Sequence, residues 1–441
     1  MKRAKRRIRL EYRSYGIKSF KKIPQIEKNL SKDEIEDIEI VAKVFPFKVD
    51  NYVIEKLIDW KNYKDDPIFR LTFPHRDMLL PQHFKMVKEA LHGGDKKNIA
   101  KIVNEIRLSL NPHPAGQLFN VPQIDGKKLE GSQHKYQETI LFFPKQGQTC
   151  HAYCSFCFRW PQFIGMEDLK FASREVELLI EYIKSNPKIT DLIFTGGDPL
   201  IMSTKLLRGY VEPIIKAKIP HLKNIRFGTK TLAFWPYRFT KDKDSQDLLK
   251  LFRKIKEAGL HVAFMAHFNH YKELETKEVE EAVEKILQTG AVIRTQAPVL
   301  RHINDDAKTW EKMWKKQVQM GMIPYYMFIA RDTGAQHYFG VPLYMAWKIF
   351  KEAYSKVSGI ARTVRGPSMS ASAGKICVEG VAKIDSKKVF VLSMIQAKNP
   401  KLVKIPFFAQ FDENALWIDD LKPAFAKKFI FEDQSLVEDL I

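Results

Sequence analysis

The chain has 441 residues, of which 45% are hydrophobic and 28% charged, an ordinary balance for a globular enzyme. No uncharged apolar run reaches the roughly 18–20 residues that a membrane helix needs. The formal net charge is +21, but lysines are spread along the chain and alternate with glutamate, as on solvated helix faces. Four cysteines exclude a disulfide scaffold and favour a reducing compartment, which we predict to be the cytoplasm.

The first region, residues 1–130, is predicted to be helix-rich. Apolar spacing in SKDEIEDIEIVAKVF and QHFKMVKEALH is typical of amphipathic helices, and Ser31 is the expected N-cap of the first. The basic start, MKRAKRRIRLEYRSYG, lacks the apolar core of a secretory signal and is interpreted as a solvated arm. No chemistry is assigned to this region.

A regular alternation of strand and helix patterns begins near residue 138. The predicted strands are TILFFPK, DLIFTGGDP, NIRFGTKT, HVAFMAHF, AVIRTQAPVL and PYYMFIARD, each followed by a helical pattern. The glycines that end three of these helices, Gly259, Gly290 and Gly321, are expected to be left-handed C-caps. Such βα repeats predict a parallel α/β sheet over residues 131–358, with right-handed crossovers and closed or partly closed into a barrel.

Polar residues gather at the ends of these predicted strands. Ligands bind at the carboxyl ends of strands in parallel βα folds, so these positions share one rim. The last region, residues 359–441, reads as a loop followed by β-hairpin material. We expect it to form a short mixed extension over the barrel mouth.

Three cysteines, Cys150, Cys154 and Cys157, follow the first predicted strand in TCHAYCSFCFRW. Structural zinc sites use four protein ligands, and the only other cysteine, Cys377, is far downstream. Three thiolates suit a [4Fe–4S] cluster that keeps one iron open. Cys377 is interpreted as a small buried hydrophobe.

This cysteine spacing resembles that of the radical S-adenosylmethionine (SAM) superfamily. The resemblance implies a (β/α)6 partial TIM barrel with helical N-terminal and short mixed C-terminal extensions. It also implies that the open iron binds SAM. The TGGDP segment, with Gly196, Gly197 and Asp198, ends the next strand, where radical SAM proteins hold the SAM amino group. Glycines there let backbone approach a ligand closely, or simply make a tight turn.

Between about residues 70 and 380 the chain resembles the lysine 2,3-aminomutase family. The segments that carry the resemblance are HKY, CHAYCSFCFRW, FTGGDPL, IRFGTKT, HFNH, TQAPVLRHIND and YYMFIARDTGAQHYFGVP. These enzymes use SAM, the cluster and pyridoxal 5′-phosphate (PLP) to move an α-amino group to the β-carbon. The resemblance therefore predicts an amino-acid substrate and a radical SAM isomerase.

Several site residues follow from this resemblance. Arg159 matches the arginine that grips the substrate α-carboxylate, a task that suits the fork of a guanidinium. Lys135 and Lys230 occupy positions of phosphate-binding arginines, although each could be a surface lysine. His267 and Gln296 match polar positions of the SAM pocket, or could be satisfied residues of the barrel interior.

Lys375 is the candidate lysine that holds PLP as a Schiff base. In the family this lysine follows a proline and four glycines, whereas here the loop is SASAGK. A lysine with this role needs a desolvated site or nearby positive charge to lower its pKa. We predict that PLP is used, although the SASAGK loop departs from the glycine-rich loop of the family.

The end of the site that holds the substrate side chain differs most from the family. Two aspartates hold the ammonium of lysine there, and in this chain they align with Arg331 and Ser368. An ammonium would be repelled by Arg331, so we predict an acidic or polar amino acid instead of lysine. In the competing interpretation Arg331 turns away and pairs with Asp332, which leaves Asp332 for an ammonium.

The leading hypothesis is a PLP-dependent amino-acid 2,3-aminomutase. A second is a radical SAM enzyme without PLP that modifies a peptide or protein side chain. A third is a cluster-bearing regulatory or nucleic-acid-binding protein, disfavoured by the intact GGDP segment and by Arg159. We expect no membrane partner, an electron donor such as flavodoxin or ferredoxin, and leave a homo-oligomer open.

Overall fold

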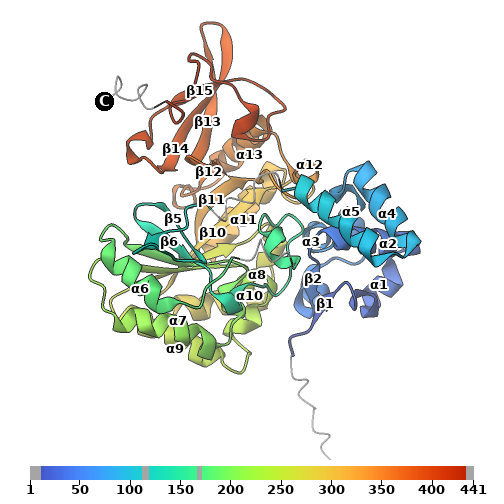
Figure 1. The fold of residues 1–441 in the computed structure, drawn as a ribbon, viewed down its shortest axis with the longest axis horizontal. Helices are drawn as coiled ribbons and strands as arrows, with labels where there is room; N and C mark the ends of the chain where they lie inside the picture. Colours follow the sequence, from blue (N-terminus) through green and yellow to red (C-terminus); the bar gives the residue numbers. More distant parts are fainter. Residues whose placement is uncertain (1–10, 112–118, 166–170, 434–441) are drawn as a thin grey trace, which may run out of the picture.

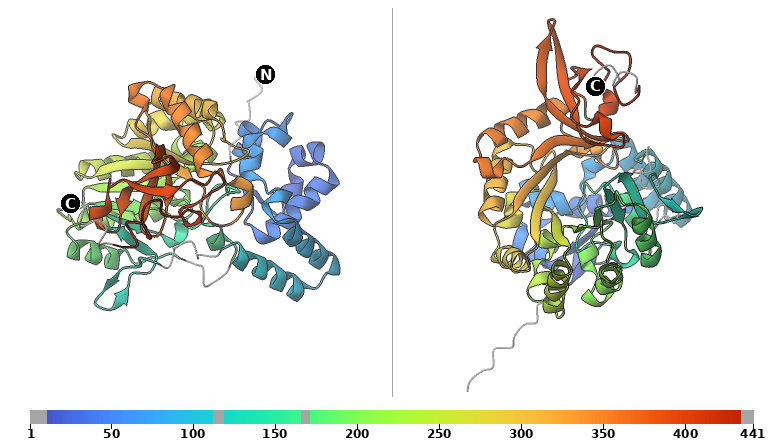
Figure 2. Two further views of the ribbon diagram at one scale, coloured as in Figure 1. Left: turned by 90° about the horizontal axis from the view of Figure 1, so that it is seen from above. Right: turned by 90° about the vertical axis from the view of Figure 1, so that its left-hand side faces the viewer.

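The computed structural model describes residues 11–111, 119–165 and 171–433. Its centre is a sheet of eleven strands in the order β15-β14-β13-β12-β11-β10-β9-β8-β7-β6-β5. The strands from β6 to β12 are parallel. The helices that follow the parallel strands lie along the outside of this curved sheet (Figure 2). The first ten residues of the basic N-terminal arm lie outside the described residues.

The six predicted strands and the helices between them are confirmed. The strands are β6 (Thr139–Phe142), β7 (Asp191–Phe194), β8 (Asn224–Thr229), β9 (His261–His267), β10 (Val292–Val299) and β11 (Ile323–Ile329). The helices are α6 (Val176–Ser185), α7 (Thr204–Lys216), α9 (Ser245–Glu257), α10 (Lys277–Leu287), α11 (Ala307–Gln319) and α13 (Leu343–Ser355). Each of the three predicted C-cap glycines has a positive φ of 80–81°.

A further strand, β12 (Arg365–Ser370), continues the parallel order after β11. This segment was predicted to be a loop, and that prediction is wrong. The hairpin of β13 (Gly374–Ile384) and β14 (Lys387–Ala397) is as predicted, and β15 (Phe407–Gln410) adds to its edge. These antiparallel strands extend the barrel sheet and project from it in Figure 1. At the opposite end, β5 (Ser132–Tyr136) pairs antiparallel with β6.

The N-terminal region packs beside the barrel (Figure 1). It consists mainly of β1 (Ser14–Gly16), α1 (Pro24–Asn29), α2 (Lys32–Val44), β2 (Lys48–Asp50), α3 (Pro67–Thr72), α4 (Pro81–Gly93) and α5 (Lys96–Ser109). Ser31 is the N-cap of α2, as expected, because its side chain accepts from the backbone N–H of Glu34. The apolar faces of α2, α4 and α5 join the same core as the barrel helices.

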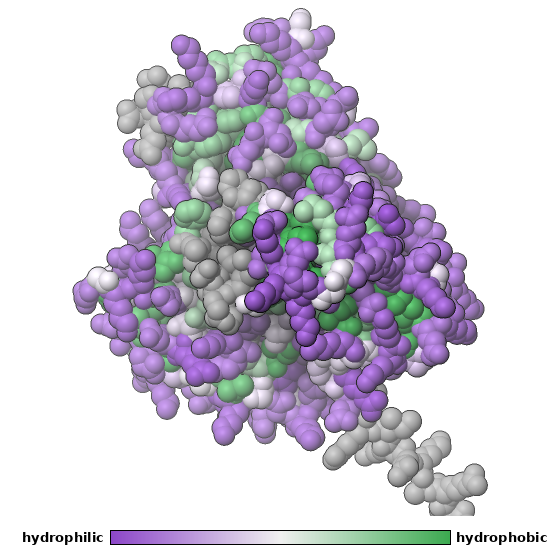
Figure 3. Space-filling view, turned by 45° about the vertical axis from the view of Figure 1, so that its right-hand side comes forward, coloured by the Kyte–Doolittle hydropathy of each residue, from purple (hydrophilic) through white to green (hydrophobic). Residues whose placement is uncertain are grey.

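The surface agrees with the spread of lysines along the sequence. The face in Figure 3 is covered mostly by hydrophilic side chains. Within the described parts of the chain, no helix combines the length and apolar character needed to span a membrane.

Candidate active site

The three cysteines lie on the loop between β6 and α6, at the carboxyl end of the first parallel strand. They are free and partly exposed, and Cys157 N–H donates to the Cys154 carbonyl at 3.1 Å. Burial raises the pKa of all three thiols, and the neighbouring cysteine charges raise those of Cys150 and Cys154 further. Cationic iron would reverse this effect, so three mutually close sulfurs fit a cluster.

A single metal ion fits this arrangement less well. Among the described residues, no three histidine, cysteine, aspartate or glutamate side chains converge on one ion. The cysteine ligands of a [4Fe–4S] cluster bind separate iron atoms, so its ligands need not converge in this way.

The N-terminal region supports the cysteine loop through its backbone. The Ser155 N–H donates to the Leu71 carbonyl at 2.8 Å, and its hydroxyl donates to the carbonyl of Arg70 at 2.7 Å. The Tyr153 N–H donates to the carbonyl of Lys48 at 2.8 Å. Sequence reasoning missed this role, because two of the three contacts join main-chain atoms that any residue could supply, and the third depends on a lone serine hydroxyl. The region therefore positions the loop that carries the cysteines.

The two glycines after β7 lie directly against the cysteine loop. A Cβ atom on Gly197 would stand 2.4 Å from the backbone nitrogen of Thr149, and one on Gly196 would stand 2.2 Å from the side chain of Gln148. Gly196 also has a φ of 126°, which side chains rarely adopt. The two glycines therefore let the loop after β7 pack closely against the cysteine loop.

Asp198 ties three loops of the rim together. Its backbone N–H donates to the carbonyl of Thr149 at 2.7 Å, and its buried carboxylate accepts from the Thr229 hydroxyl at 2.8 Å. The backbone N–H groups of Leu200, Lys230 and Thr231 also donate to it at 2.8–3.0 Å. The carboxylate is thus occupied by the protein itself, which makes Asp198 a residue that positions the rim.

His267 and Gln296 are neighbours across β9 and β10. Burial lowers the pKa of His267, so the imidazole is neutral, and its ring lies 5.7 Å from that of Phe156 in the cysteine loop. Its Nε2 atom is buried without a hydrogen-bond partner among the described residues. A buried polar atom without a partner beside the cysteine loop fits a ligand such as SAM.

Lys230 has a partner other than the predicted phosphate. Its ammonium lies 2.6 Å from a carboxylate oxygen of Glu273, which is fully buried, and 4.4 Å from the ring centroid of Phe234. Its charge lowers the pKa of Cys154, so it lies on the cysteine side of the site. The Glu273 ion pair already neutralises this lysine, so its charge is not free for a phosphate.

Lys375 has the surroundings that a PLP lysine needs. It is the second residue of β13, where its Nζ lies 4.5 Å from the ring centroid of Tyr326 and 5.9 Å from that of Tyr136. Burial lowers the pKa of Lys375 to about 7, and the positive charges of Arg226, Arg365 and Lys135 lower it in the same direction. Near neutral pH this lysine is therefore partly an uncharged nucleophile.

Lys135 lies on β5 beside this lysine. Its ammonium donates to the carbonyl of Ala371 in the SASAGK loop and lies 5.4 Å from the ring centroid of Tyr136. Burial lowers the pKa of Lys135 to about 8, and the charges of Arg331 and Lys398 contribute. Lys135 and Lys375 are thus brought together by the fold.

Arg159 and Arg331 extend this group of cations toward the cysteines. The guanidinium of Arg159 stacks on Phe143 and Phe158, with ring centroids 4.5 and 5.0 Å away. Arg331 lies 5.4 Å from the same Phe158 ring and 5.9 Å from that of Trp417. Burial lowers the pKa of Arg159 to about 10, and nearby Arg331 adds to this effect.

Asp332 and Ser368 complete the predicted site residues. The Nε atom of Arg331 lies 3.6 Å from a carboxylate oxygen of Asp332, and this Nε makes no hydrogen bond to a described residue. The pair is therefore an ion contact that leaves the guanidinium free to donate. Ser368 is fully buried, and its hydroxyl donates to the carbonyl of Met327 at 3.4 Å. That it contacts the substrate side chain stays a prediction.

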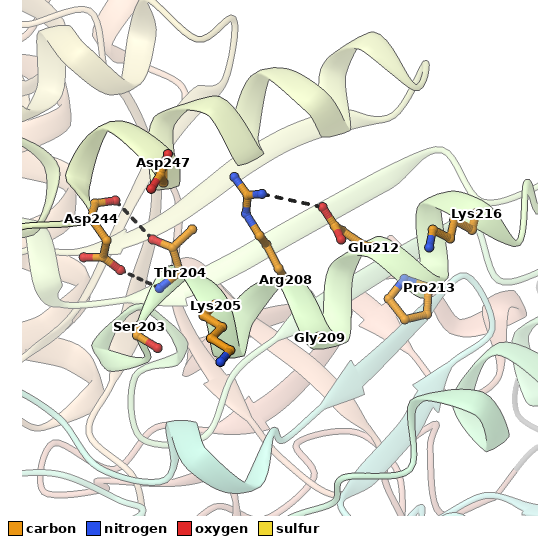
Figure 4. Close-up of a pocket in the computed structure, with 10 residues that line it drawn as sticks. All are labelled: Ser203, Thr204, Lys205, Arg208, Gly209, Glu212, Pro213, Lys216, Asp244 and Asp247. Carbon is orange, nitrogen blue, oxygen red and sulfur yellow. Dashed lines mark hydrogen bonds and ion pairs between the residues drawn. The ribbon is translucent and has the colours of Figure 1, made fainter.

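A surface groove lies apart from this site. Figure 4 shows it on the outer side of α7, lined by Thr204, Arg208 and Asp244 among others. Its volume is about 830 Å³, but it contains none of the residues described above. Ligands of parallel βα barrels bind at the strand ends, so this groove is not the candidate active site.

Sequence reasoning missed Tyr136, Tyr326, Gln396 and Trp417. The first two sit in motifs that carried the family resemblance, HKY and YYMFIARD, so the motifs themselves were the available signal. Gln396 belongs to none of these motifs, and its side-chain oxygen accepts a hydrogen bond from the Lys375 ammonium at 3.1 Å. Trp417 belongs to the C-terminal extension that was expected over the barrel mouth, and it reaches Arg331.

Known proteins resemble this chain over most of its length. An Aquifex aeolicus protein with a provisional assignment as an L-lysine 2,3-aminomutase is 33% identical over 354 residues, or 80% of this chain and 82% of the relative. The L-lysine 2,3-aminomutase of Fusobacterium nucleatum is 25% identical over 70% of this chain and 68% of its own length. That of Bacillus subtilis is 28% identical over 57% and 50%, respectively. No family model matches the chain.

Solved structures give weaker likenesses. Streptococcus suis SuiB, solved with the precursor peptide SuiA, shares 10% identity over 66% of this chain and 62% of its own, with a TM-score of 0.34. The radical SAM methyltransferase TsrM of Kitasatospora setae covers 44% of this chain and 36% of its own, with a TM-score of 0.30. Both likenesses are too distant to bear on the substrate.

Proposed function

The chain belongs to the lysine 2,3-aminomutase family of radical SAM isomerases, and from that premise we propose that it moves the α-amino group of an acidic amino acid to the β-carbon. Enzymes of this family use a [4Fe–4S] cluster, SAM and PLP. When bound, these groups supply a hydrogen-abstracting radical and a conjugated ring over which an unpaired electron can spread. The protein supplies position, charge and exclusion of water.

We assign the proposed roles to the site residues described above. Cys150, Cys154 and Cys157 would hold the cluster, and His267 and Gln296 would line the adjoining SAM pocket with the backbone after β7. Lys375 would hold PLP covalently, because a partly uncharged amine near pH 7 can attack an aldehyde. The aromatic rings around Lys375 keep water away and preserve the lowered pKa.

The single observation that carries the proposed substrate class is the cation group at the site. Arg159, Arg331, Lys135 and Lys375 each act electrostatically on another member of the group. Two of the cations are guanidiniums, which match carboxylates bidentately. In the proposal Arg159 binds the α-carboxylate and Arg331 binds the carboxylate of the side chain. An ammonium in the same place would meet positive charge in a partly desolvated pocket.

Asp332 is compatible with this substrate. Its contact with Arg331 at 3.6 Å is longer than a hydrogen bond, and a quarter of the Arg331 side chain remains exposed. Arg331 can therefore keep Asp332 as an ionic neighbour while it donates to a substrate. The competing interpretation, in which Asp332 receives an ammonium, makes the opposite prediction for lysine.

The test is a substrate panel with the full chain, reconstituted anaerobically with iron, sulfide and PLP. The protein is incubated with SAM, a reductant and aspartate, glutamate, glutamine or lysine, and β-amino acids are identified by mass spectrometry. We expect an acidic amino acid to be converted with a kcat/KM at least about 100-fold above that of lysine. Equal turnover of lysine would refute the role of Arg331.

The same reconstitution decides the PLP assignment. A Lys375-dependent absorbance of bound PLP is expected, and SAM cleavage without any bound PLP would favour action on a peptide or protein side chain. The four free cysteines and the cluster fit a reducing compartment such as the cytoplasm. Flavodoxin or ferredoxin is the proposed electron donor.

A further inference from the structure

Two arginines of the barrel sheet have aromatic neighbours but no anionic partner. Arg294 on β10 and Arg365 on β12 both stack on Tyr325, with ring-centroid distances of 5.0 and 4.2 Å. Within the part of the chain that the structure describes, neither guanidinium has an ion pair or a side-chain hydrogen bond. Both side chains are partly exposed. Each guanidinium therefore keeps its donors available.

A third arginine of the sheet shows the contrast. Arg226 on β8 donates through Nε to a carboxylate oxygen of Asp191 at 2.9 Å, and the two groups form an ion pair. The chain thus neutralises one of the three arginines with a carboxylate of its own. Arg294 and Arg365 have only ring faces, which attract a cation without neutralising it.

Arg365 of this pair lies beside the candidate PLP lysine, and Arg294 shares the Tyr325 ring with Arg365. The guanidinium of Arg365 is 4.4 Å from the ring centroid of Tyr326, and the ammonium of Lys375 is 4.5 Å from the same centroid. The charge of Arg365 also contributes to the lowered pKa of Lys375. Several like charges in a partly desolvated space repel one another, and an anion would relieve that repulsion.

Phosphate suits this place better than a carboxylate does. A phosphate monoester carries up to two negative charges and three terminal oxygens, so it can accept from two guanidinium forks together. The substrate carboxylates already have Arg159 and Arg331, which lie on the cysteine side against Phe158. The SASAGK loop carries one glycine before the lysine, so it offers little of a glycine-rich phosphate cradle.

We propose that Arg294 and Arg365 form a phosphate-binding site, and that the phosphate is that of PLP held at Lys375. The assignment of PLP rests on the proposed function. Arg226 does not share this role because Asp191 occupies it. The site replaces the phosphate contacts that we first predicted for Lys230, which is paired with Glu273.

The experiment compares PLP with pyridoxal, which lacks the phosphate. Each aldehyde is titrated into the full-length, cluster-reconstituted protein, and binding is followed by absorbance, so no turnover is needed. The dissociation constant of pyridoxal divided by that of PLP measures the contribution of the phosphate. In Arg294→Gln and Arg365→Gln we expect this ratio to fall about 10-fold or more, because charged hydrogen bonds are lost. Pyridoxal affinity should stay within about 2-fold of the unsubstituted protein.

Two variants make the result specific. Arg362→Gln removes an exposed arginine that stacks on Tyr354 near the start of β12, and it should leave the ratio unchanged. Lys135→Gln tests the competing phosphate ligand. If Lys135→Gln abolishes the preference for PLP while both arginine variants keep it, the proposal is overturned. Equal losses for PLP and pyridoxal in the arginine variants would also overturn it, because the arginines would then be structural.

A last arm separates this inference from the proposed function. If the unsubstituted protein binds neither aldehyde, PLP use fails, and inorganic phosphate becomes the probe in a thermal-shift titration. If phosphate raises the Tm of the unsubstituted protein but not of the Arg294→Gln/Arg365→Gln double variant, the two arginines form a phosphate site that does not depend on PLP. No difference between the double variant and the unsubstituted protein would refute the site itself.

Discussion

Gln396 accepts a hydrogen bond from Lys375, with Oε1 3.1 Å from Nζ. The two residues face each other across β13 and β14. Gln396 is neutral, so the lysine gains a partner without gaining a negative charge that would raise its pKa. This pairing lets the lysine remain partly uncharged near neutral pH.

The first prediction is a pH dependence set by this pair. Covalent attachment of PLP needs the neutral amine, so its rate should rise with pH and level off above about 7, where Lys375 titrates. An ordinary lysine, with a pKa near 10.4, would be only about one part in 2,500 neutral at pH 7. Gln396→Glu places a carboxylate beside the amine and should move the midpoint up by about 1–3 pH units.

Stopped-flow absorbance between pH 6 and 10 measures this midpoint. Gln410→Glu is the matched control, because Gln410 is exposed on neighbouring strand β15 and should leave the midpoint unchanged. A midpoint that stays near 7 in Gln396→Glu would show that Gln396 does not contact Lys375 in solution.

The part of the fold that periodicity determines was predictable, and β12 shows where prediction stopped. The βα repeats follow from alternating strand and helix patterns, each long enough to read locally. The sequence of β12, RGPSMS, contains glycine and proline, which disfavour strands. It is a strand because β11 and β13 pair with it on either side. That pairing is a tertiary effect.

The candidate site likewise has a part that could be predicted from the sequence and a part that could not. The cysteines could be predicted because their spacing is local. The pKa of Lys375 could not, because it depends on rings from β5 and β11 and on arginines from β8 and β12. Arg294 did leave a signal, since it interrupts the apolar strand AVIRTQAPVL. A lone cation in such a strand points to the barrel interior, and only the structure shows its partner ring.

The second prediction concerns Arg331 and substrate charge. Arg331→Asp reverses the charge at the proposed side-chain pocket, so kcat/KM for the acidic substrate should fall at least about 100-fold, mainly through KM. Activity with lysine should rise from its low starting level. Steady-state assays with both substrates measure the change.

Asp332→Asn separates the two interpretations of this pocket. If Arg331 binds the substrate, removal of the Asp332 carboxylate should preserve or improve KM for the acidic substrate, because a competing anion is gone. If Asp332 instead receives an ammonium, the same variant loses its activity with a basic amino acid. Loss of activity in Asp332→Asn together with full activity in Arg331→Gln would contradict our assignment.

The third prediction concerns the reduction potential of the cluster. Lys48 on β2 donates to the Thr149 hydroxyl at 3.2 Å, next to Cys150, and its positive charge favours the thiolate of that cysteine. A positive charge near a cluster favours the reduced, more negative state. Lys48→Met should therefore lower the midpoint potential by roughly tens of millivolts.

An anaerobic redox titration followed by electron paramagnetic resonance measures that shift. Lys48→Arg keeps the positive charge, so its midpoint potential should stay close to that of the unsubstituted protein. Lys56→Met removes an exposed lysine that pairs with Glu278 and should have no effect. An unchanged potential in Lys48→Met would mean that the ammonium is screened from the cluster by solvent.

The fourth prediction tests the contact between the loop after β7 and the cysteine loop. Gly197→Ala would force a Cβ to within 2.4 Å of the Thr149 backbone, where no flexible side chain can move aside. We expect the free energy of unfolding to fall by about 1–3 kcal/mol. Because Thr149 precedes Cys150, iron content after reconstitution should fall as well. Chemical denaturation and iron analysis give the two measurements.

Gly209→Ala is the matched control for this substitution. Gly209 lies within α7 on the outer groove of Figure 4, with nothing within 4 Å of an added Cβ. Alanine favours a helix over glycine, so the variant should gain about 0.5–1 kcal/mol of stability and keep its iron. Equal iron content in the two variants would show that the glycine contact does not position the cysteines. Loss of iron in Gly197→Ala alone would place the effect in the cysteine loop, since the two substitutions add the same methyl group.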